Sequence, residues 1–149
     1  MKITYSGILA ASPQQEQNRK ALALENAIRK EGSEIEFLVK HTFGGDVYAR
    51  ELHIPKGCTV VGEIHKTENL NILLKGELSV TTDEGVQRLT APALVVAKPG
   101  SKRVGFAHED TIWITLHATR ERDLDKIKKH FIAPSFEALQ GLTPAYLEG

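Results

Sequence analysis

The chain cannot form an internal disulfide, because Cys58 is the only cysteine among its 149 residues. A single free cysteine fits a reducing compartment. Long apolar runs are also absent: no stretch of about 18 apolar residues exists to span a membrane. The N-terminus has Lys2 but lacks the apolar segment of a signal peptide. These absences predict a cytoplasmic protein with no membrane partner.

An excess of charge of either sign is missing as well. Nineteen basic residues balance nineteen acidic ones, so the formal net charge is zero. A neutral chain has no broad electrostatic attraction for nucleic acid, and we expect no extended nucleic-acid surface. The sequence also lacks a phosphate-binding loop, a nucleophile elbow, a dinucleotide-binding glycine motif and a Cys-x-x-Cys pair. These gaps argue against several common enzyme classes.

The composition is that of an ordinary globular domain, with 41% hydrophobic and 26% charged residues. The length predicts a single domain over residues 1–149 with its own core. A helix is predicted over residues 12–32, where Ser12 followed by Pro13 forms an N-cap and Gly32 supplies a stop.

Between residues 35 and 119, short runs of β-branched and aromatic residues alternate with turn signals. About eight such runs, spaced roughly every 8 to 12 residues, favour a sandwich or a small barrel. The predicted strands are 34–43, 47–54, 59–66, 70–82 with a break at Lys75-Gly76, 86–90, 93–97, 102–107 and 111–118. From Glu121 a helical spacing of apolar residues returns, which predicts a C-terminal helical segment over 121–149.

One stretch has the spacing of a known motif. Gly57 is followed after five residues by Glu63-x-His65, then by Asn69 and a closing Gly76. This stretch resembles the first motif of the cupin family, which has His at the positions of Glu63 and His65 and Glu at that of Asn69. The glycine frame is kept, whereas only one of the three usual metal-ligand positions keeps its residue type.

A second stretch, Pro99-Gly100 followed by Arg103, resembles the second cupin motif with arginine in place of its histidine. The resemblance implies a mainly β fold: a single double-stranded β-helix (jelly-roll) barrel of the RmlC-like kind over residues 35–119, with a helix at each end. The sequences of residues 47–51, 63–74 and 105–113 also resemble those of small cupin-like proteins of bacteriophages.

In cupins the motif positions face the barrel lumen, and alternate residues of a strand share a face. The resemblance therefore implies that Glu63, His65, Asn69 and Asn71 line the lumen. Arg103 would add a fixed positive charge that suits a carboxylate or phosphate. The alternative is a structural ion pair between Arg103 and Glu63 that fills a lost metal site.

Three candidates lie on other predicted strands. Trp113 and His117 share a face of the last strand and would look into the lumen, where Trp113 offers an aromatic surface to a ligand. A core tryptophan fits the pattern equally well. Tyr48 is predicted to face the lumen or an interface.

A divalent metal remains an open alternative as cofactor. Such a site needs three or four His or carboxylate ligands. Glu63 and His65 qualify, and Glu68 would reach them if the turn shifted by one residue. Arg103 stays protonated and cannot be a ligand.

Leu70, Ile72 and Leu74 are predicted to lie on the outside of the barrel. Three adjacent aliphatic side chains need a cover, either the terminal helices or a second copy of the chain. Many cupins dimerise through such a sheet face, so we expect a homodimer.

The pattern as a whole predicts a small-molecule-binding cupin that holds a polar, anionic ligand in its lumen. A phage-encoded protein of this kind could sequester a host metabolite or nucleotide signal. Enzymatic activity stays open. One alternative is a metal-free sugar isomerase or epimerase, with His65 as a base tuned by Glu63 and Tyr48 as proton donor. Others are a metal-dependent oxygenase or isomerase and a structural virion component with a filled lumen.

Overall fold

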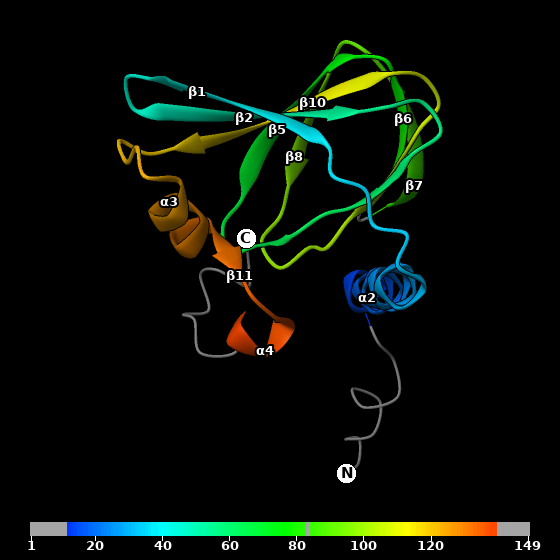
Figure 1. Ribbon diagram of the computed structural model, residues 1–149. Coiled ribbons are helices and arrows are strands. Elements are labelled where there is room, and N and C mark those ends of the chain that lie inside the picture. Colours follow the sequence, from blue (N-terminus) through cyan, green and yellow to red (C-terminus); the bar gives the residue numbers. More distant parts are fainter. Residues whose placement is uncertain (1–11, 83, 140–149) are drawn as a thin grey trace.

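The computed structural model of the chain describes residues 12–82 and 84–139. Two antiparallel sheets face each other, and helices lie toward both ends of the described chain (Figure 1). Across these residues, no helix combines the length and the apolar character that crossing a membrane requires.

The strands follow one another closely along the chain. They are β1 (Leu38–Gly44), β2 (Val47–Ile54), β3 (Thr59–Val61), β4 (Ile64–His65), β5 (Asn69–Lys75), β6 (Glu77–Thr82), β7 (Gly85–Thr90), β8 (Ala93–Ala97), β9 (Val104–Ala107), β10 (Thr111–Ala118) and β11 (Ile132–Ala133). One sheet has the order β1-β2-β10-β5-β8, the facing sheet has the order β3-β9-β6-β7, and β11 pairs with β4. Neighbouring strands come from distant parts of the chain, as in a jelly roll. The predicted mainly β jelly-roll barrel is confirmed.

The glycines of the two motifs stand where the backbone requires them. Gly57, Gly76 and Gly100 all have positive φ angles. At Gly76 a Cβ atom would lie 2.5 Å from the carbonyl oxygen of Asp110 and 2.6 Å from the hydroxyl of Thr111. Any other residue would therefore have to displace the turn that leads into β10.

Helix α2 (Pro13–Glu31) has the ends that its sequence predicts. The Ser12 hydroxyl accepts a hydrogen bond from the Gln15 N–H, and the Gln15 side chain accepts one from the Ser12 N–H. Gly32 ends the helix in the left-handed conformation. Of the described side chains of α2 only Ala21 is buried, so polar contacts rather than apolar packing attach this helix to the barrel.

Two predicted strands are shorter in the structure, and α2 explains both differences. The run 34–43 becomes a strand only at Leu38, because residues 33–37 lead from α2 to the sheet and Glu34 pairs with Arg29 at 3.1 Å. The run 102–107 becomes a strand only at Val104, because the Lys102 N–H donates to Asn18 of α2.

The predicted strand 59–66 is divided into β3 and β4. Gly62 leaves the ladder, since its N–H donates to the Arg103 carbonyl at 2.8 Å and its carbonyl accepts from the Lys102 ammonium at 3.0 Å. Glu63 follows this break, so its side chain is half-exposed.

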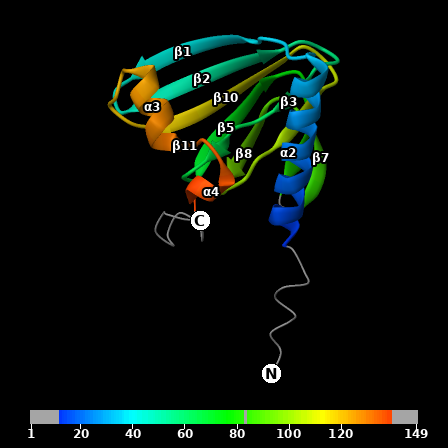
Figure 2. The same ribbon diagram turned by 60° about the horizontal axis from the view of Figure 1, so that its bottom comes forward.

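The C-terminal segment lies against one end of the barrel. Helix α3 (Leu124–Phe131) begins at the N-cap Asp123 and buries Ile127 and Phe131, and β11 and α4 (Phe136–Leu139) follow it. Figure 2 shows α3 beside the ends of β1 and β2, whereas α2 runs along the other side of the molecule past β3. Residues 140–149 of the predicted segment 121–149 lie outside the described part.

The main core cluster lies between the two sheets. It consists of Ile54, Leu73, Leu78, Val80 and Ala107. The outer face of the five-stranded sheet is apolar too: Leu70, Leu74, Leu94 and Val96 are 39%, 51%, 70% and 56% exposed. The three aliphatic residues that the sequence places outside therefore do face outward, and the described helices lie elsewhere.

Candidate functional site

A cavity of about 1310 Å³ occupies the space between the two sheets. The seven residues that the sequence suggests for ligand binding all line it, although they come from different strands and loops. They are Tyr48, Glu63, His65, Asn69, Arg103, Trp113 and His117. Glu68 does not line it and is exposed.

The five-stranded sheet contributes a polar wall to this cavity. Cross-strand pairing places Thr115 of β10 opposite Arg50 of β2 and opposite Asn71 of β5. In the next inward row His117 lies opposite Tyr48. These polar residues, apart from the half-buried Arg50, are nearly inaccessible to bulk solvent, and buried polar groups are costly unless something hydrogen-bonds to them.

A directed chain of hydrogen bonds orients the two asparagines. The Thr115 hydroxyl donates to Asn71 Oδ1 at 2.8 Å, and Asn71 Nδ2 donates to Asn69 Oδ1 at 2.8 Å and to the Val95 carbonyl at 3.3 Å. The Val95 carbonyl can only accept, which settles the orientation of the Asn71 amide. Asn69 consequently presents its amide nitrogen as a donor. That nitrogen is buried and has no hydrogen-bond partner among the described residues.

His117 is the second buried group with unused hydrogen-bonding capacity. It is 5% exposed, and its Nδ1 has no partner within the described part of the chain. Burial, and then the nearby His65 and Arg50, lower the pKa of His117 to about 4. The ring is therefore neutral at pH 7, when one ring nitrogen donates and the other accepts.

His117 belongs to a group of stacked rings that crosses the polar end of the cavity. Its ring stacks on Tyr48 and on His65 with centroid separations of 5.8 Å and 5.6 Å, and it lies 4.4 Å from the Phe131 ring. The Tyr48 hydroxyl and His41 Nδ1 are hydrogen-bonded at 2.7 Å. Phe131 of α3 closes this end of the lumen over the rings.

Burial also shifts the pKa values of two other ring groups. It raises the pKa of Tyr48, and the Arg50 charge opposes this shift. It lowers the pKa of His65, where the Glu63 carboxylate acts in the opposite direction. Both groups are therefore held in their neutral forms at pH 7.

Arg50 carries the positive charge at the centre of this wall. Its charge acts on the pKa values of Tyr48, His65 and His117. No ion pair or hydrogen bond links the Arg50 side chain to another residue in 12–82 or 84–139. Sequence reasoning did not include Arg50 among the candidates, although it shares a strand face with Tyr48, which was the signal that could have found it.

Arg103 lies on the facing side of the cavity, ahead of β9. Its Nη1 donates to the Thr81 carbonyl of β6 at 2.8 Å, so the protein itself uses part of its hydrogen-bonding capacity. Glu63 pairs with a residue other than Arg103, the partner that the sequence left open as an alternative. Glu63 Oε1 instead lies 3.3 Å from the Lys128 ammonium of α3.

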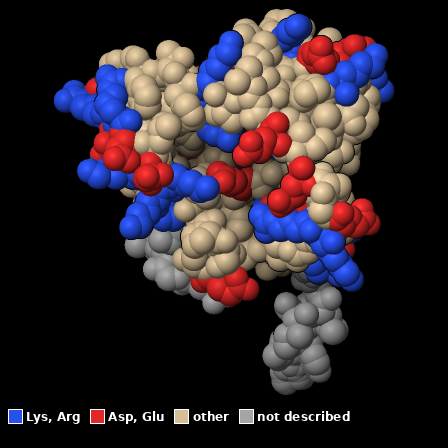
Figure 3. All heavy atoms as spheres, viewed as in Figure 1, with Lys and Arg blue, Asp and Glu red and all other residues tan. Residues whose placement is uncertain are grey.

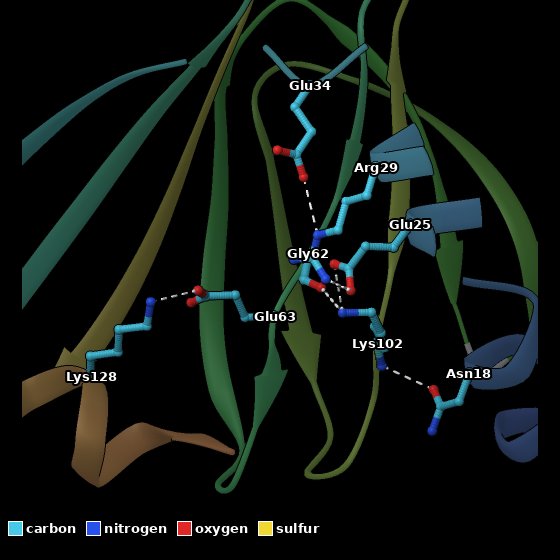
Figure 4. A network of polar contacts seen from close by, with 8 residues as sticks. All are labelled: Asn18, Glu25, Arg29, Glu34, Gly62, Glu63, Lys102 and Lys128. Carbon is cyan, nitrogen blue, oxygen red and sulfur yellow. Dashed lines mark hydrogen bonds and ion pairs between the residues drawn. The ribbon is translucent and has the colours of Figure 1, made fainter. Parts of the chain in front are cut away.

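Charged side chains gather around the cavity on the face seen in Figure 3, where the surface is hollowed. Figure 4 shows how they lie: Lys128 reaches Glu63 from α3, while Glu25 and Arg29 of α2 gather opposite around Lys102 and Gly62. Lys102 is 6% exposed and pairs with Glu25 at 3.0 Å. The charges of these residues are neutralised in ion pairs, whereas Arg50 inside the cavity forms no ion pair with the described residues.

Trp113 lies at the apolar end of the cavity. It is partly buried, packs against the main core cluster and pairs across strands with Leu52 and with Leu73. It therefore serves the core and the cavity wall at once.

The residues present do not fit a metal site. Glu68 points away from the cavity wall, and the Glu63 carboxylate is engaged with Lys128 at the half-exposed rim. In the described part of the chain, no three His, Cys, Asp or Glu side chains come together in a group that could hold a metal ion. We therefore derive no chemistry through a metal.

Solved structures with a similar fold include cupin and double-stranded β-helix proteins. The plu4264 protein from Photorhabdus luminescens has a TM-score of 0.50 at 13% identity, covering 64% of this chain and 86% of its own. KdgF from Halomonas sp. has a TM-score of 0.49 at 17% identity, covering 64% and 94%. An RmlC-like cupin family protein from Methanocaldococcus jannaschii has a TM-score of 0.46 at 15% identity, covering 56% and 81%.

No protein-family model matches the sequence, and no curated protein matches it. Sequence identities this low indicate a similar fold and say nothing about function. Function must therefore be argued from the site.

Proposed function

We propose that the protein binds a small anionic molecule in its lumen, with Arg50 as the group that holds the acid. The observation that carries the proposal is the unpaired charge of Arg50 in a cavity that is also lined by two residues with buried, unpartnered nitrogens, Asn69 Nδ2 and His117 Nδ1. Leaving a buried donor unsatisfied costs about 1–3 kcal/mol. An acid group would accept from Arg50 and Asn69, and from His117 in its Nδ1–H tautomer.

Charge around the site supports an anion rather than a cation. His65 and His117 are neutral at pH 7, and each neutral ring has one N–H that can donate a hydrogen bond to an anion. The Asn69 oxygen already accepts from Asn71, so only its amide nitrogen is left for a ligand. The Glu63 carboxylate, which also lines the cavity, is directed to Lys128 at the rim. Arg103 would act at longer range, because Thr81 takes part of its donor capacity.

The proposal is tested by native mass spectrometry of the protein as purified and by thermal shift across a library of small acids. Ligands of the lumen should raise the unfolding temperature according to RT ln(1 + [L]/Kd). Arg50→Met should weaken binding by roughly 10- to 100-fold, as expected for losing a hydrogen-bonded charge. Arg120→Met is the matched control, because Arg120 is exposed, pairs with Asp46 and does not line the cavity. Equal affinity in Arg50→Met and Arg120→Met would refute the proposal.

A metal-free enzyme is the second candidate, favoured by the hydrogen bond between Tyr48 and His41 and by the neutral His65 on the same cavity wall. His65 would accept a proton and Tyr48 would donate one. Incubating a bound ligand with the protein in D₂O tests this, because proton transfer at carbon would add deuterium to the ligand. Incorporation that vanishes in His65→Gln supports an enzyme, and no incorporation leaves a binding protein. A structural component with a filled lumen fits poorly with a cavity of about 1310 Å³.

We also propose a homodimer formed through the outer face of the five-stranded sheet. On this face Val96 of β8 pairs with Leu70 of β5 and Leu94 pairs with Ile72, and Leu70, Leu94 and Val96 are exposed. A contiguous apolar face of this kind marks an association surface. A two-fold axis through the face would bury the same residues of both copies against each other.

Sequestration of a host metabolite or nucleotide signal, which the resemblance to phage proteins suggests, would be one use of such a binding protein. It requires tight binding without turnover, so the D₂O experiment separates it from the enzymatic alternative.

A further inference from the structure

The cavity wall changes character along the strands of the five-stranded sheet. Three successive inward rows can be followed through the cross-strand register. The rows are Leu52–Trp113–Leu73, then Arg50–Thr115–Asn71, then Tyr48–His117. Polarity is therefore confined to the second and third rows.

The third row is closed by the C-terminal helix. Ile127 and Phe131 of α3 cluster with Tyr48, and Phe131 also covers His117. A ligand held by Arg50 cannot extend far in this direction. It must extend toward the first row or toward the rim.

The wall on the side of the first row is apolar on both sheets. It is formed by Phe37, Leu52, Val60, Leu78, Val80 and Trp113. Successive inward residues of a strand are about 7 Å apart, so this wall begins about 7 Å from Arg50. A hydroxyl-rich body placed here would lose its water without gaining partners, whereas an apolar body gains from burial.

We propose that the ligand is an organic acid whose acid group is joined directly to an aliphatic or aromatic body at least about 7 Å long. The acid group contacts Arg50, Asn69 and His117, and the body lies against Leu52 and Trp113. This inference rests on the anion-binding function proposed above and narrows it to one class of ligand. Sugars and nucleotides, which carry hydroxyl groups next to their acid group, belong outside the class.

Calorimetric titration of the unmodified protein with acetate, butanoate, hexanoate and octanoate tests the inference. The dissociation constant should fall by about fourfold for each added methylene group until the apolar wall is covered. Octanol, inorganic phosphate and adenosine monophosphate serve as comparisons. Octanol lacks the charge, phosphate lacks the body, and the nucleotide carries a ribose between the two.

Each outcome decides between the two proposals. Equal affinity along the acid series, or tighter binding of the nucleotide than of octanoate, overturns the inference and leaves anion binding intact. Octanol binding as tightly as octanoate overturns anion binding, and the inference falls with it. Binding of none of these probes overturns both.

Two substitutions in the apolar wall locate the body of the ligand. Leu52→Gln and Trp113→Leu should both reduce the gain per methylene group. Both side chains also pack against the core, so the unfolding temperature of each variant is measured first and the variant that keeps its fold decides. Val86→Gln is the control, since Val86 of β7 is 72% exposed. An unchanged gain per methylene group in the folded wall variant would overturn the inference.

Discussion

The two faces of β5 in the five-stranded sheet differ in a way that is partly opposite to the usual arrangement, because its inner face is polar at Asn69 and Asn71 and apolar only at Leu73. An antiparallel sheet with one solvated face commonly turns apolar residues inward and polar residues outward. Here the inner face of β5 carries Asn69 and Asn71, which are 6% and 4% exposed, while Leu70 and Leu74 on its outer face are 39% and 51% exposed. Within a single chain this pattern leaves polar side chains buried and apolar side chains in water, so both faces of β5 are suited to contacts with other molecules.

Each face makes sense once a partner is supplied. Polar groups inside are balanced by a ligand that accepts hydrogen bonds, and apolar groups outside are balanced by a second copy of the chain. Both proposals follow from the same alternation along β5 and β10.

Leu94→Asp should give the largest change, by breaking the outer interface. Desolvating an unpaired carboxylate at the centre of an apolar contact is costly, so the dimer dissociation constant should rise by about 100-fold or more. Sedimentation velocity over a range of protein concentrations measures this. Val86→Asp, an equally exposed change on the other sheet, should leave the dimer intact. A wild-type chain that stays monomeric at every concentration would contradict the dimer.

The inner face should make stability depend on pH through His117. Its pKa in the folded protein, about 4, is below the unfolded value of 6.5, so the unfolded state takes up a proton first as the pH falls. Stability is therefore full above the unfolded pKa and is lost as the pH falls from 6.5 toward 4. Between pH 7 and pH 5 the unfolding equilibrium constant should rise by about 20-fold from this group.

Denaturant unfolding at a series of pH values measures that effect. The variant His117→Phe, which keeps a ring in contact with Tyr48 and Phe131, should flatten the dependence. A dependence that is equally steep in His117→Phe would show that another group causes it.

Asn69→Leu should change both stability and binding. The Asn69 amide nitrogen has no partner in the described protein, but the Asn69 oxygen accepts from Asn71, so the substitution leaves one buried N–H of Asn71 unpaired and should lower the free energy of unfolding by about 1–3 kcal/mol. Affinity for the acid should fall by about fivefold to tenfold, because one neutral hydrogen bond to the ligand is lost. Calorimetry and denaturant unfolding on the same samples check both. Lower stability with unchanged affinity would mean that Asn69 serves the fold alone.

The smallest effect is expected at the rim. Glu63 pairs with Lys128 where both side chains are about half-exposed or more, and such surface pairs contribute only about 0–1 kcal/mol. Glu63→Gln should therefore change ligand affinity by less than about threefold. Titration of the protein and of this variant with Zn²⁺ provides the comparison. Tight zinc binding that Glu63→Gln abolishes would restore Glu63 as a metal ligand.

Alternation along strands was readable from the sequence. A period of two places Trp113 with His117 on β10 and Asn69 with Asn71 on β5, and the resemblance to cupins implied that these faces look inward. The caps of α2 were readable because Ser12, Pro13 and Gln15 act within one helical turn. In each case the determining contacts are close in sequence.

Contacts between distant segments were not readable. Lys128 of α3 takes the Glu63 carboxylate, a pairing that joins the C-terminal helix to the break between β3 and β4. His41, which had no identifiable partner in the sequence, hydrogen-bonds to Tyr48 because β1 and β2 pair as a hairpin. The sequence could not show that the Arg50 side chain forms no ion pair with the described residues, because this depends on where the carboxylates of distant segments lie.

Local patterns in the sequence predicted about eight strands in a sandwich or small barrel, because turn chemistry and strand alternation are local properties. The jelly roll and the residues that face its lumen were implied by the resemblance to the cupin motifs. Only the tertiary structure decided which of those residues are left with unsatisfied charge or hydrogen-bonding capacity. That property depends on every neighbour within a few ångströms, and these neighbours come from strands and helices far apart in the chain.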